Sequence, residues 1–235
     1  MEFLYDTHFH LDLQKDRTAA IYEIESRQIY TIAVTNLPDL YRKEVGDIAS
    51  KYIRFALGFH PELIHQYKNQ IPMMWDLLPS VRYIGEVGLD FVDLTYKNEQ
   101  ITFFSELIER CRYDNSKILT IHSRQAVRQV LDIIGYNFRF KPILHWFTGT
   151  KNELIDAVEK GFYFSVNKSM IKTQKFQSML GLIPRDRLLL ETDSPFITFS
   201  HSHYETLYKI NQFINEKKID INMWNNFRSV LGGKL

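Results

Sequence analysis

Residues 3–10 read Phe3-Leu4-Tyr5-Asp6-Thr7-His8-Phe9-His10, an apolar, strand-like run that ends in two histidines separated by one residue. Four later apolar runs also end in a side chain that can bind metal, and these side chains are Glu86, His122, His145 and Asp193. Parallel α/β barrels and open sheets place their chemistry at the carboxyl ends of their strands. The repeated pattern therefore predicts that imidazoles and carboxylates from distant parts of the chain meet in one metal site.

Strand-like runs alternate with helical patterns from one end of the chain to the other. The predicted strands are Phe3–Thr7, Tyr30–Thr35, Arg54–Gly58, Tyr83–Val87, Ile118–His122, Pro142–His145, Gly161–Ser165 and Arg187–Glu191. The predicted helices are Leu40–Tyr52, Lys97–Tyr113, Arg124–Ile134, Glu153–Lys160, Phe176–Leu182, Tyr204–Glu216 and, roughly, Ile221–Leu231. This alternation predicts an α/β fold with about eight parallel strands, the number in a (β/α)8 barrel. An open doubly wound sheet is the alternative, but ligands from the first and last strands meet only if the sheet closes.

Composition sets limits on the fold and on the partners. The chain has 235 residues, of which 45% are hydrophobic, enough for a sizeable core, and no linker or repeat divides it, so residues 1–235 are predicted to form a single domain. A net charge of only +1 gives no overall basic surface of the kind found in many nucleic-acid-binding proteins. The sole cysteine, Cys111, excludes an internal disulfide. No signal peptide or membrane span is recognisable, so a cytoplasmic location is predicted.

Each candidate ligand also has a simpler explanation when it is taken alone. His8 and His10 share one face of a strand because side chains alternate with a period of two, but surface histidines are common. Glu86 lies between glycines in Gly85-Glu86-Val87-Gly88, where it could instead be a buried acid paired with Arg82 or Arg124. A second histidine pair, at positions 201 and 203, precedes a helix in a polar loop and is interpreted as a capping and surface feature.

The remaining candidates are also open to two interpretations. His122 and His145 could each be a hydrogen-bonded core histidine, although both follow successive predicted strands. Asp193, which precedes Ser194-Pro195, could cap the next helix. Taken as a set, the strand-end positions favour a shared metal site, in which the two oxygens of one carboxylate, Glu86, could bridge two cations ~3.5–4 Å apart.

Six stretches, in this order, resemble the TatD-like metal-dependent deoxyribonucleases of the amidohydrolase superfamily. They are residues 6–12 (Asp-Thr-His-Phe-His-Leu-Asp), 58–62 (Gly-Phe-His-Pro-Glu), 84–90 (Ile-Gly-Glu-Val-Gly-Leu-Asp), 121–124 (Ile-His-Ser-Arg), 145–149 (His-Trp-Phe-Thr-Gly) and 190–195 (Leu-Glu-Thr-Asp-Ser-Pro). Asn226-Phe227 is similar to part of the family's C-terminal helix. The resemblance implies a distorted (β/α)8 TIM barrel with two divalent metal ions.

The resemblance also assigns roles to individual residues. One metal would be held by His8, His10, Glu86 and Asp193, and the other by Glu86, His122 and His145. His60 would face the scissile phosphate, whereas its simpler explanation is a residue at the entry to a helix before Pro61. The family's activity implies a DNA phosphodiester as substrate, hydrolysed by a metal-activated water whose proton Asp193 could accept.

The chain departs from the family in the loops that hold substrate. After Asp193 the family usually carries an Arg-Gly-Lys-Arg-Asn-Glu-Pro-like run, whereas residues 196–203 here contain no Lys or Arg. Asn167-Lys168 replaces a glycine-containing turn. The shorter loops predict attack on single-stranded DNA ends, in the manner of a 3'-5' exonuclease. They also resemble those of the short TatD-like component of bacterial multi-gene anti-phage (Qat) systems, which implies protein partners in such a defence system.

The predicted ligands and substrate contacts leave alternatives open. His60, Arg124 and Lys168 are the candidates to offset charge on the phosphate. Imidazole-rich ligation favours Zn²⁺, Mn²⁺ or Fe²⁺ over Mg²⁺, although Mg²⁺ supports activity across the family. The alternative functions are a hydrolase of small esters, amides or aminoacyl-tRNA, and a scaffolding subunit with a vestigial metal site. The oligomeric state is not predicted.

Overall fold

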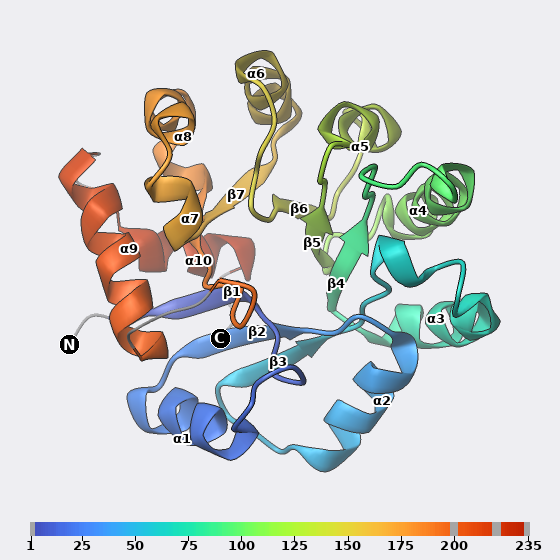
Figure 1. The fold of residues 1–235 in the computed structure, drawn as a ribbon, viewed down its shortest axis with the longest axis horizontal. Helices are drawn as coiled ribbons and strands as arrows, with labels where there is room; N and C mark the ends of the chain where they lie inside the picture. The colour runs from blue at the N-terminus through green and yellow to red at the C-terminus, as the bar shows by residue number, and fades with distance from the viewer. Residues whose placement is uncertain (1–2, 198–201, 218–221, 233–235) are drawn as a thin grey trace.

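The computed structural model describes residues 3–197, 202–217 and 222–232. Within these residues eight strands form the centre of the molecule (Figure 1). They are β1 (Tyr5–Phe9), β2 (Tyr30–Val34), β3 (Ile53–Ala56), β4 (Tyr83–Gly88), β5 (Ile118–His122), β6 (Lys141–Leu144), β7 (Tyr163–Val166) and β8 (Leu188–Leu190). Every named pair of neighbouring strands is parallel.

Helices surround the strands on the outside (Figure 1). They are α1 (Arg17–Arg27), α2 (Pro38–Asp47), α3 (Ile71–Leu77), α4 (Lys97–Cys111), α5 (Val127–Ile134), α6 (Lys151–Lys160), α7 (Lys168–Ile171), α8 (Gln174–Met179), α9 (His203–Lys217) and α10 (Met223–Val230). Not one helix in the described part of the chain is both long and apolar enough to cross a membrane.

Two irregular seams close the strands into a barrel. Parallel ladders join β1-β2-β3 and β4-β5-β6-β7-β8, with a register shift in the β1–β2 pair and another in the β4–β5 pair. Between β3 and β4, the Leu57 amide donates to the Tyr83 carbonyl (2.9 Å) and the Gly85 amide donates to the Leu57 carbonyl (2.9 Å). Between β8 and β1, the Asp193 amide donates to the His8 carbonyl (2.9 Å). The prediction of a distorted (β/α)8 barrel is therefore confirmed, and the open-sheet alternative is wrong because the first and last strands adjoin.

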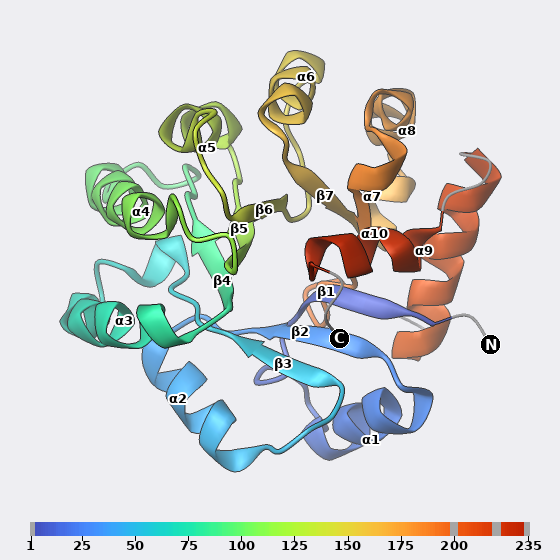
Figure 2. The ribbon, with the colours of Figure 1, turned by 180° about the vertical axis from the view of Figure 1, so that it is seen from behind.

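The amino-terminal end of the barrel is covered by α10 (Figure 2). The Tyr5 ring on β1 stacks on the Phe227 ring with centroids 4.2 Å apart. The Asn226 side-chain amide donates to the carbonyls of Arg185 (2.7 Å) and Leu188 (2.9 Å), where β8 begins. These contacts stabilise the end of the barrel opposite the predicted metal ligands, which leaves the carboxyl ends of the strands as the place for a site.

Element boundaries differ from the predictions where polar residues lie inside strands or apolar residues are few. β1 begins and ends two residues later than predicted, so His8 lies inside the strand. Gly161, predicted as the first residue of a strand, ends α6 in the left-handed conformation (φ 91°), which glycine adopts without strain. The helices α1, α3 and α7 were not predicted. Of these, α1 buries only Ile24 and the other two are short, so their apolar periodicity is weak.

Candidate metal centre

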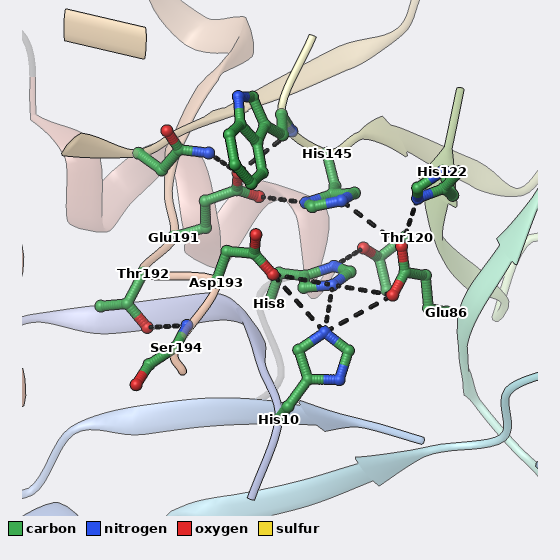
Figure 3. A network of polar contacts seen from close by, with 12 residues as sticks. His8, His10, Glu86, Thr120, His122, His145, Glu191, Thr192, Asp193 and Ser194 are labelled. Atoms are coloured by element: carbon green, nitrogen blue, oxygen red, sulfur yellow. Dashed lines mark hydrogen bonds and ion pairs between the residues drawn. The ribbon is translucent and has the colours of Figure 1, made fainter. Parts of the chain in front are cut away.

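Five strand ends bring the six predicted metal ligands together at the carboxyl end of the barrel (Figure 3). The ligands are His8 in β1 and His10 just after it, Glu86 in β4, His122 at the end of β5, His145 after β6 and Asp193 after β8. All are buried except His122, whose side chain is 14% exposed. Residues as far apart as positions 8 and 193 thus share one cluster.

Four ligand atoms form the first half of the cluster, at the β8–β1 seam. The His8 Nε2 and His10 Nε2 atoms lie 3.3 Å apart, and each is 3.5 Å from Glu86 Oε2. Asp193 Oδ1 lies 3.8 Å from His8 Nε2 and 3.5 Å from His10 Nε2. The ligand atoms of His8, His10 and Asp193 all lie within 4.8 Å of one another, a spacing at which one ion could contact all three. Imidazole nitrogen and carboxylate oxygen are ligands that Zn²⁺ accepts. The first half therefore fits a divalent cation.

Asp193 is held in position by an unusual backbone conformation. Its φ is 53°, in the left-handed region that few residues other than glycine adopt, although aspartate tolerates it better than most. The hydrogen bond from the Asp193 amide to the His8 carbonyl joins this turn to β1. Backbone strain of this kind is common at functional sites. The turn directs the Asp193 carboxylate back toward His8 and His10.

The second half of the cluster surrounds the other oxygen of Glu86. Glu86 Oε1 lies 2.6 Å from His122 Nδ1, 3.4 Å from His145 Nε2 and 3.6 Å from His60 Nε2. The shortest of these is a hydrogen bond in which the imidazole donates to the carboxylate. The opposite nitrogen of His122 is 2.8 Å from Asp90 Oδ2. Glu86 thus contacts both halves, one through each oxygen, as a bridging ligand would.

Burial and opposite charges shift the pKa values of these groups in different directions. Burial alone would lower the pKa of His122, but its hydrogen bonds to Asp90 and Glu86 outweigh burial and raise the pKa to about 9. Burial alone would raise the pKa of Glu86, but the surrounding imidazoles hold it well below the usual range. Burial lowers the pKa of His60 to about 4, so His60 is neutral near pH 7.

Glycines beside Glu86 allow neighbouring backbones to approach closely. A Cβ on Gly58 would lie 1.6 Å from the Thr35 carbonyl oxygen, and a Cβ on Gly88 would lie 2.0 Å from that of His122. These glycines are therefore required by the close packing of β4, and of the segment after β3, against neighbouring backbone. Pairing of Glu86 with Arg82 is wrong, because the Arg82 guanidinium donates to the Leu231 carbonyl (2.5 Å).

Two carboxylates that support the histidines were not predicted. Asp90 contacts His122, as described above. Glu191 Oε2 lies 3.3 Å from His145 Nδ1, and Glu191 Oε1 accepts from the Trp146 amide (3.0 Å) and the Asn167 side chain (2.8 Å). A carboxylate on the far nitrogen fixes the orientation of a histidine ligand and increases its basicity. The sequence signal was an acid inside an otherwise apolar strand end, as in Leu190-Glu191-Thr192.

A cavity of about 630 Å³ opens beside the second half of the cluster. His60, Glu86, His122, His145, Asp193 and Arg124 are among the residues that line it, as are Trp146 and Phe196. Lys168 begins α7 and is not one of the lining residues, so the geometry gives its predicted substrate contact no support.

His60 also precedes the short 3-10 turn Pro61–Leu63, where its Nδ1 accepts from the Glu62 amide (3.3 Å). It therefore serves as the turn-entry residue and faces the cavity as well.

The interpretation of the second histidine pair needs correction. His201 lies outside the described residues. His203, predicted to be a surface or capping residue, has a side chain only 7% exposed, with its Nε2 2.9 Å from Asp6 Oδ2. Its ring stacks on the Phe9 ring with centroids 4.7 Å apart. The polar composition of the loop concealed this contact, because it depends on the packing of α9 against β1.

Comparison with known proteins places the chain in a family. The profile of the family described as "TatD related DNase" matches residues 5–225, and the chain belongs to this family. It is 28% identical over 178 residues to a "Putative deoxyribonuclease TATDN1 homolog" of Encephalitozoon cuniculi, a match that covers 74% of this chain and 63% of that protein. It is 25% identical over 195 residues to the "3'-5' ssDNA/RNA exonuclease TatD" of Erwinia billingiae, covering 78% of this chain and 74% of that protein.

The fold is shared with a solved structure of the same family. The crystal structure of YJJV, a TatD homologue from Escherichia coli K12, superposes with a TM-score of 0.84 at 18% sequence identity. The match covers 97% of this chain and 98% of that one. The resemblance seen in the six sequence motifs is thus confirmed at the level of family and fold.

Proposed function

We propose that the protein is a metal-dependent hydrolase that cleaves DNA phosphodiesters, proceeding from the 3' end of single strands. The observation that carries the proposal is the position of Glu86, whose two oxygens contact the first and second halves of one buried imidazole-carboxylate cluster beside an open cavity. Membership of the TatD family and the exonuclease named among its relatives support it. Deoxyribonuclease activity therefore ranks above the alternative hydrolysis of small esters, amides or aminoacyl-tRNA.

The proposed ligand sets follow the two halves of the cluster. His8, His10, Glu86 and Asp193 would hold one divalent ion, and Glu86, His122 and His145 the other. Such a pair lowers the pKa of a bound water and neutralises charge on a phosphodiester. The imidazole-rich sets favour Zn²⁺, Mn²⁺ or Fe²⁺ over Mg²⁺.

Three groups of the chain would then act on substrate. Asp193, whose Oδ1 faces the first half, is the candidate to accept the proton of the attacking water. His60 faces the cavity from its position just before the 3-10 turn Pro61–Leu63, as a neutral imidazole, so it can donate one hydrogen bond to a phosphate oxygen. Arg124 supplies a positive charge in the lining of the same cavity. Glu86 holds the two halves at a set distance.

The cavity favours an unpaired end over a duplex. Its described lining contains a single Lys or Arg, Arg124, so few phosphates can be held by charge. It also contains two aromatic residues, Trp146 and Phe196, and the Phe196 side chain is 61% exposed. Exposed aromatic rings bind unpaired bases by stacking, without sequence preference. A terminal nucleotide can therefore be held by one base and one phosphate.

The test is digestion of 5'-labelled single-stranded DNA by metal-loaded protein. A ladder that shortens from the 3' end is expected, and it should stop when the 3' end is blocked. Asp193→Asn should abolish the ladder, whereas the control Asp186→Asn, at a side chain 76% exposed, should leave it unchanged. Hydrolysis of small esters without any attack on DNA would favour the alternative activity, and metal binding without turnover of either would favour the scaffold.

The biological setting remains a prediction. A role in anti-phage defence of the Qat type, with protein partners, rests on the shortened substrate loops of the sequence. A cytoplasmic location and a single domain over residues 1–235 are likewise proposals. Co-purification with products of neighbouring genes would test the first of these directly.

A further inference from the structure

His203 lies behind the first half of the metal cluster, although it comes from α9 at the other end of the chain. Its Nε2 is 2.9 Å from Asp6 Oδ2, and its side chain is 7% exposed. The His203 ring is nearly parallel to the Phe9 ring (10° between planes), so it is held between the sheet and the helix. Phe9 is the residue between His8 and His10, which places His203 directly against the metal-binding segment of β1.

The carboxylate of Asp6 connects His203 to both sides of the β8–β1 seam. Asp6 Oδ1 accepts from the His8 amide (2.9 Å) and from the Thr192 amide (3.1 Å). Asp6 Oδ2 accepts from the Thr192 hydroxyl and from His203. One fully buried carboxylate therefore holds the backbone of His8, a candidate metal ligand. It also holds the backbone of Thr192, which precedes the candidate ligand Asp193.

A buried carboxylate keeps this arrangement only while its oxygens are hydrogen-bonded. Burial of an ionised carboxylate without partners is costly, so a carboxylate that loses donors rotates toward others. Asp6 has two backbone amides, one hydroxyl and one imidazole as donors. His203 is the only one of these donors that comes from outside β1 and the β8 turn, so it joins the seam to the helical layer.

The position of His203 is itself set by α1. The Glu23 carboxylate accepts from the amides of His203 (3.3 Å) and Tyr204 (3.0 Å) at the amino terminus of α9. An acidic side chain at a helix amino terminus satisfies free amides and interacts favourably with the helix dipole. The Arg27 guanidinium lies over the Tyr204 ring, 5.0 Å from its centroid. The start of α9 is therefore anchored by contacts other than the one between His203 and Asp6.

We infer that His203 is a positioning residue for the first half of the metal centre, acting through Asp6 on His8 and Asp193. This rests on the proposed metal-dependent function and adds to it a residue in the segment where the basic run of the family is missing. Loss of the His203 donor would leave Asp6 Oδ2 with the Thr192 hydroxyl as its remaining donor and would loosen the link between β1 and the Asp193 turn. Changes behind metal ligands typically weaken metal affinity or activity about 10- to 100-fold.

The test compares His203→Leu, which removes the donor, with His203→Gln, whose amide keeps a donor of similar reach. Zn²⁺ affinity of the full chain is measured by competition with a chromophoric chelator, and kcat and KM are measured on single-stranded DNA at saturating metal. His203→Leu is expected to weaken the tighter ion about 10- to 100-fold and to lower kcat with KM nearly unchanged. His203→Gln should restore most of both. His65→Leu, at an exposed histidine that stacks on Tyr96, is the matched control and should leave both unchanged.

Several outcomes would overturn the inference. Equal Zn²⁺ affinity in wild type, His203→Leu and His203→Gln would show that Asp6 does not need the imidazole. Equal losses in both variants, in parallel with a lower melting temperature, would show a purely structural role. If His203→Leu does not fold, the variant Glu23→Ala, which loosens the anchoring of α9, takes its place. Its Zn²⁺ affinity, kcat and KM are then compared with those of His203→Gln. Wild-type protein that binds Zn²⁺ but cleaves no DNA would overturn the proposed function instead, and the affinity series would still stand.

Discussion

The two halves of the metal centre share Glu86 but differ in how their atoms are spaced. In the first half, the separations between the ligand atoms of His8, His10, Glu86 and Asp193 lie between 3.3 and 3.8 Å. In the second half, His122 donates to Glu86 at 2.6 Å, and Asp90 supports the same ring from behind. The first half is spaced for a cation, whereas a proton on His122 already balances the charge of the second.

If Glu86 bridges two ions as proposed, this difference implies that the two sites differ in affinity. An ion entering the second half must displace the proton of His122, whose pKa of about 9 keeps the imidazole charged at neutral pH. An ion entering the first half meets His8, whose pKa burial lowers, so that this imidazole is already neutral. We therefore expect the first half to bind its ion more tightly near pH 7.

The largest effect is expected when the bridge is removed. The wild type is expected to hold close to two ions per chain, and Glu86→Ala should reduce this metal content because both ions lose a ligand. The same variant should lower the rate of DNA hydrolysis by about three orders of magnitude. Elemental analysis and single-turnover kinetics provide the measurement. Glu106→Ala, at a surface ion pair with Arg110, is the matched control. Full metal content in Glu86→Ala would contradict the proposal that Glu86 bridges the two halves.

The second prediction separates the halves. His10→Ala should weaken the tighter ion, whereas His122→Ala should leave that ion in place and remove the weaker one. Both variants should keep the fold, because the barrel core is packed by residues such as Tyr5 and Phe227 at the opposite end. Calorimetric titration with Zn²⁺ and circular dichroism provide the measurements. Loss of the same ion in both variants would mean that the two halves act as one site.

The third prediction concerns pH and follows from the raised pKa of His122. Below about pH 9 the metal-free protein holds a proton on His122, so the affinity for the second ion should fall as pH falls, by up to about tenfold per pH unit for each proton displaced. The same proton stabilises the metal-free fold most strongly below the ordinary histidine pKa, and that contribution is lost as pH rises toward 9. Burial alone would lower the pKa of His145, but Glu191 and Glu86 raise it well above the usual value, so this second ligand of the same ion is also protonated. Calorimetry in buffers of different ionisation enthalpy should therefore detect about two protons released with the second ion. A second binding step with no proton release at pH 7 would contradict the assignment.

The smallest expected effect concerns the substrate side of the second half. Arg124 is the single Lys or Arg in the described lining of the cavity, so the salt dependence of single-stranded DNA affinity should correspond to only two or three phosphates. Arg124→Gln should reduce that slope by about one and weaken binding similarly for all sequences. Fluorescence anisotropy over a salt series provides the measurement. A steep slope with preferred cleavage inside duplex DNA would show a basic surface beyond the cavity and would sink the terminal-exonuclease proposal.

Much of the fold could be predicted from residue patterns along the chain. Strand positions agreed within two residues, and β5 agreed at both ends, because apolar runs bounded by turn residues are local properties of a sequence. Helices with weak apolar periodicity, α1, α3 and α7, were not found. The two seams could not be predicted either, since the bonds between β3 and β4, and between β8 and β1, are irregular and join backbones without a sequence signature.

The sequence by itself determined which side chains lie at or near strand ends. It therefore predicted one shared metal site formed by His8, His10, Glu86, His122, His145 and Asp193. Only the tertiary structure decided which groups support them. Asp90, Glu191 and His203 could each have been a surface residue, and Lys168 proved not to line the cavity. His203 reaches Asp6 across 197 positions of sequence, so its role depends on closure of the barrel and docking of α9. The physical reason is that a strand-end position follows from a period of two along the chain, whereas a hydrogen-bond partner depends on distances that exist only after packing.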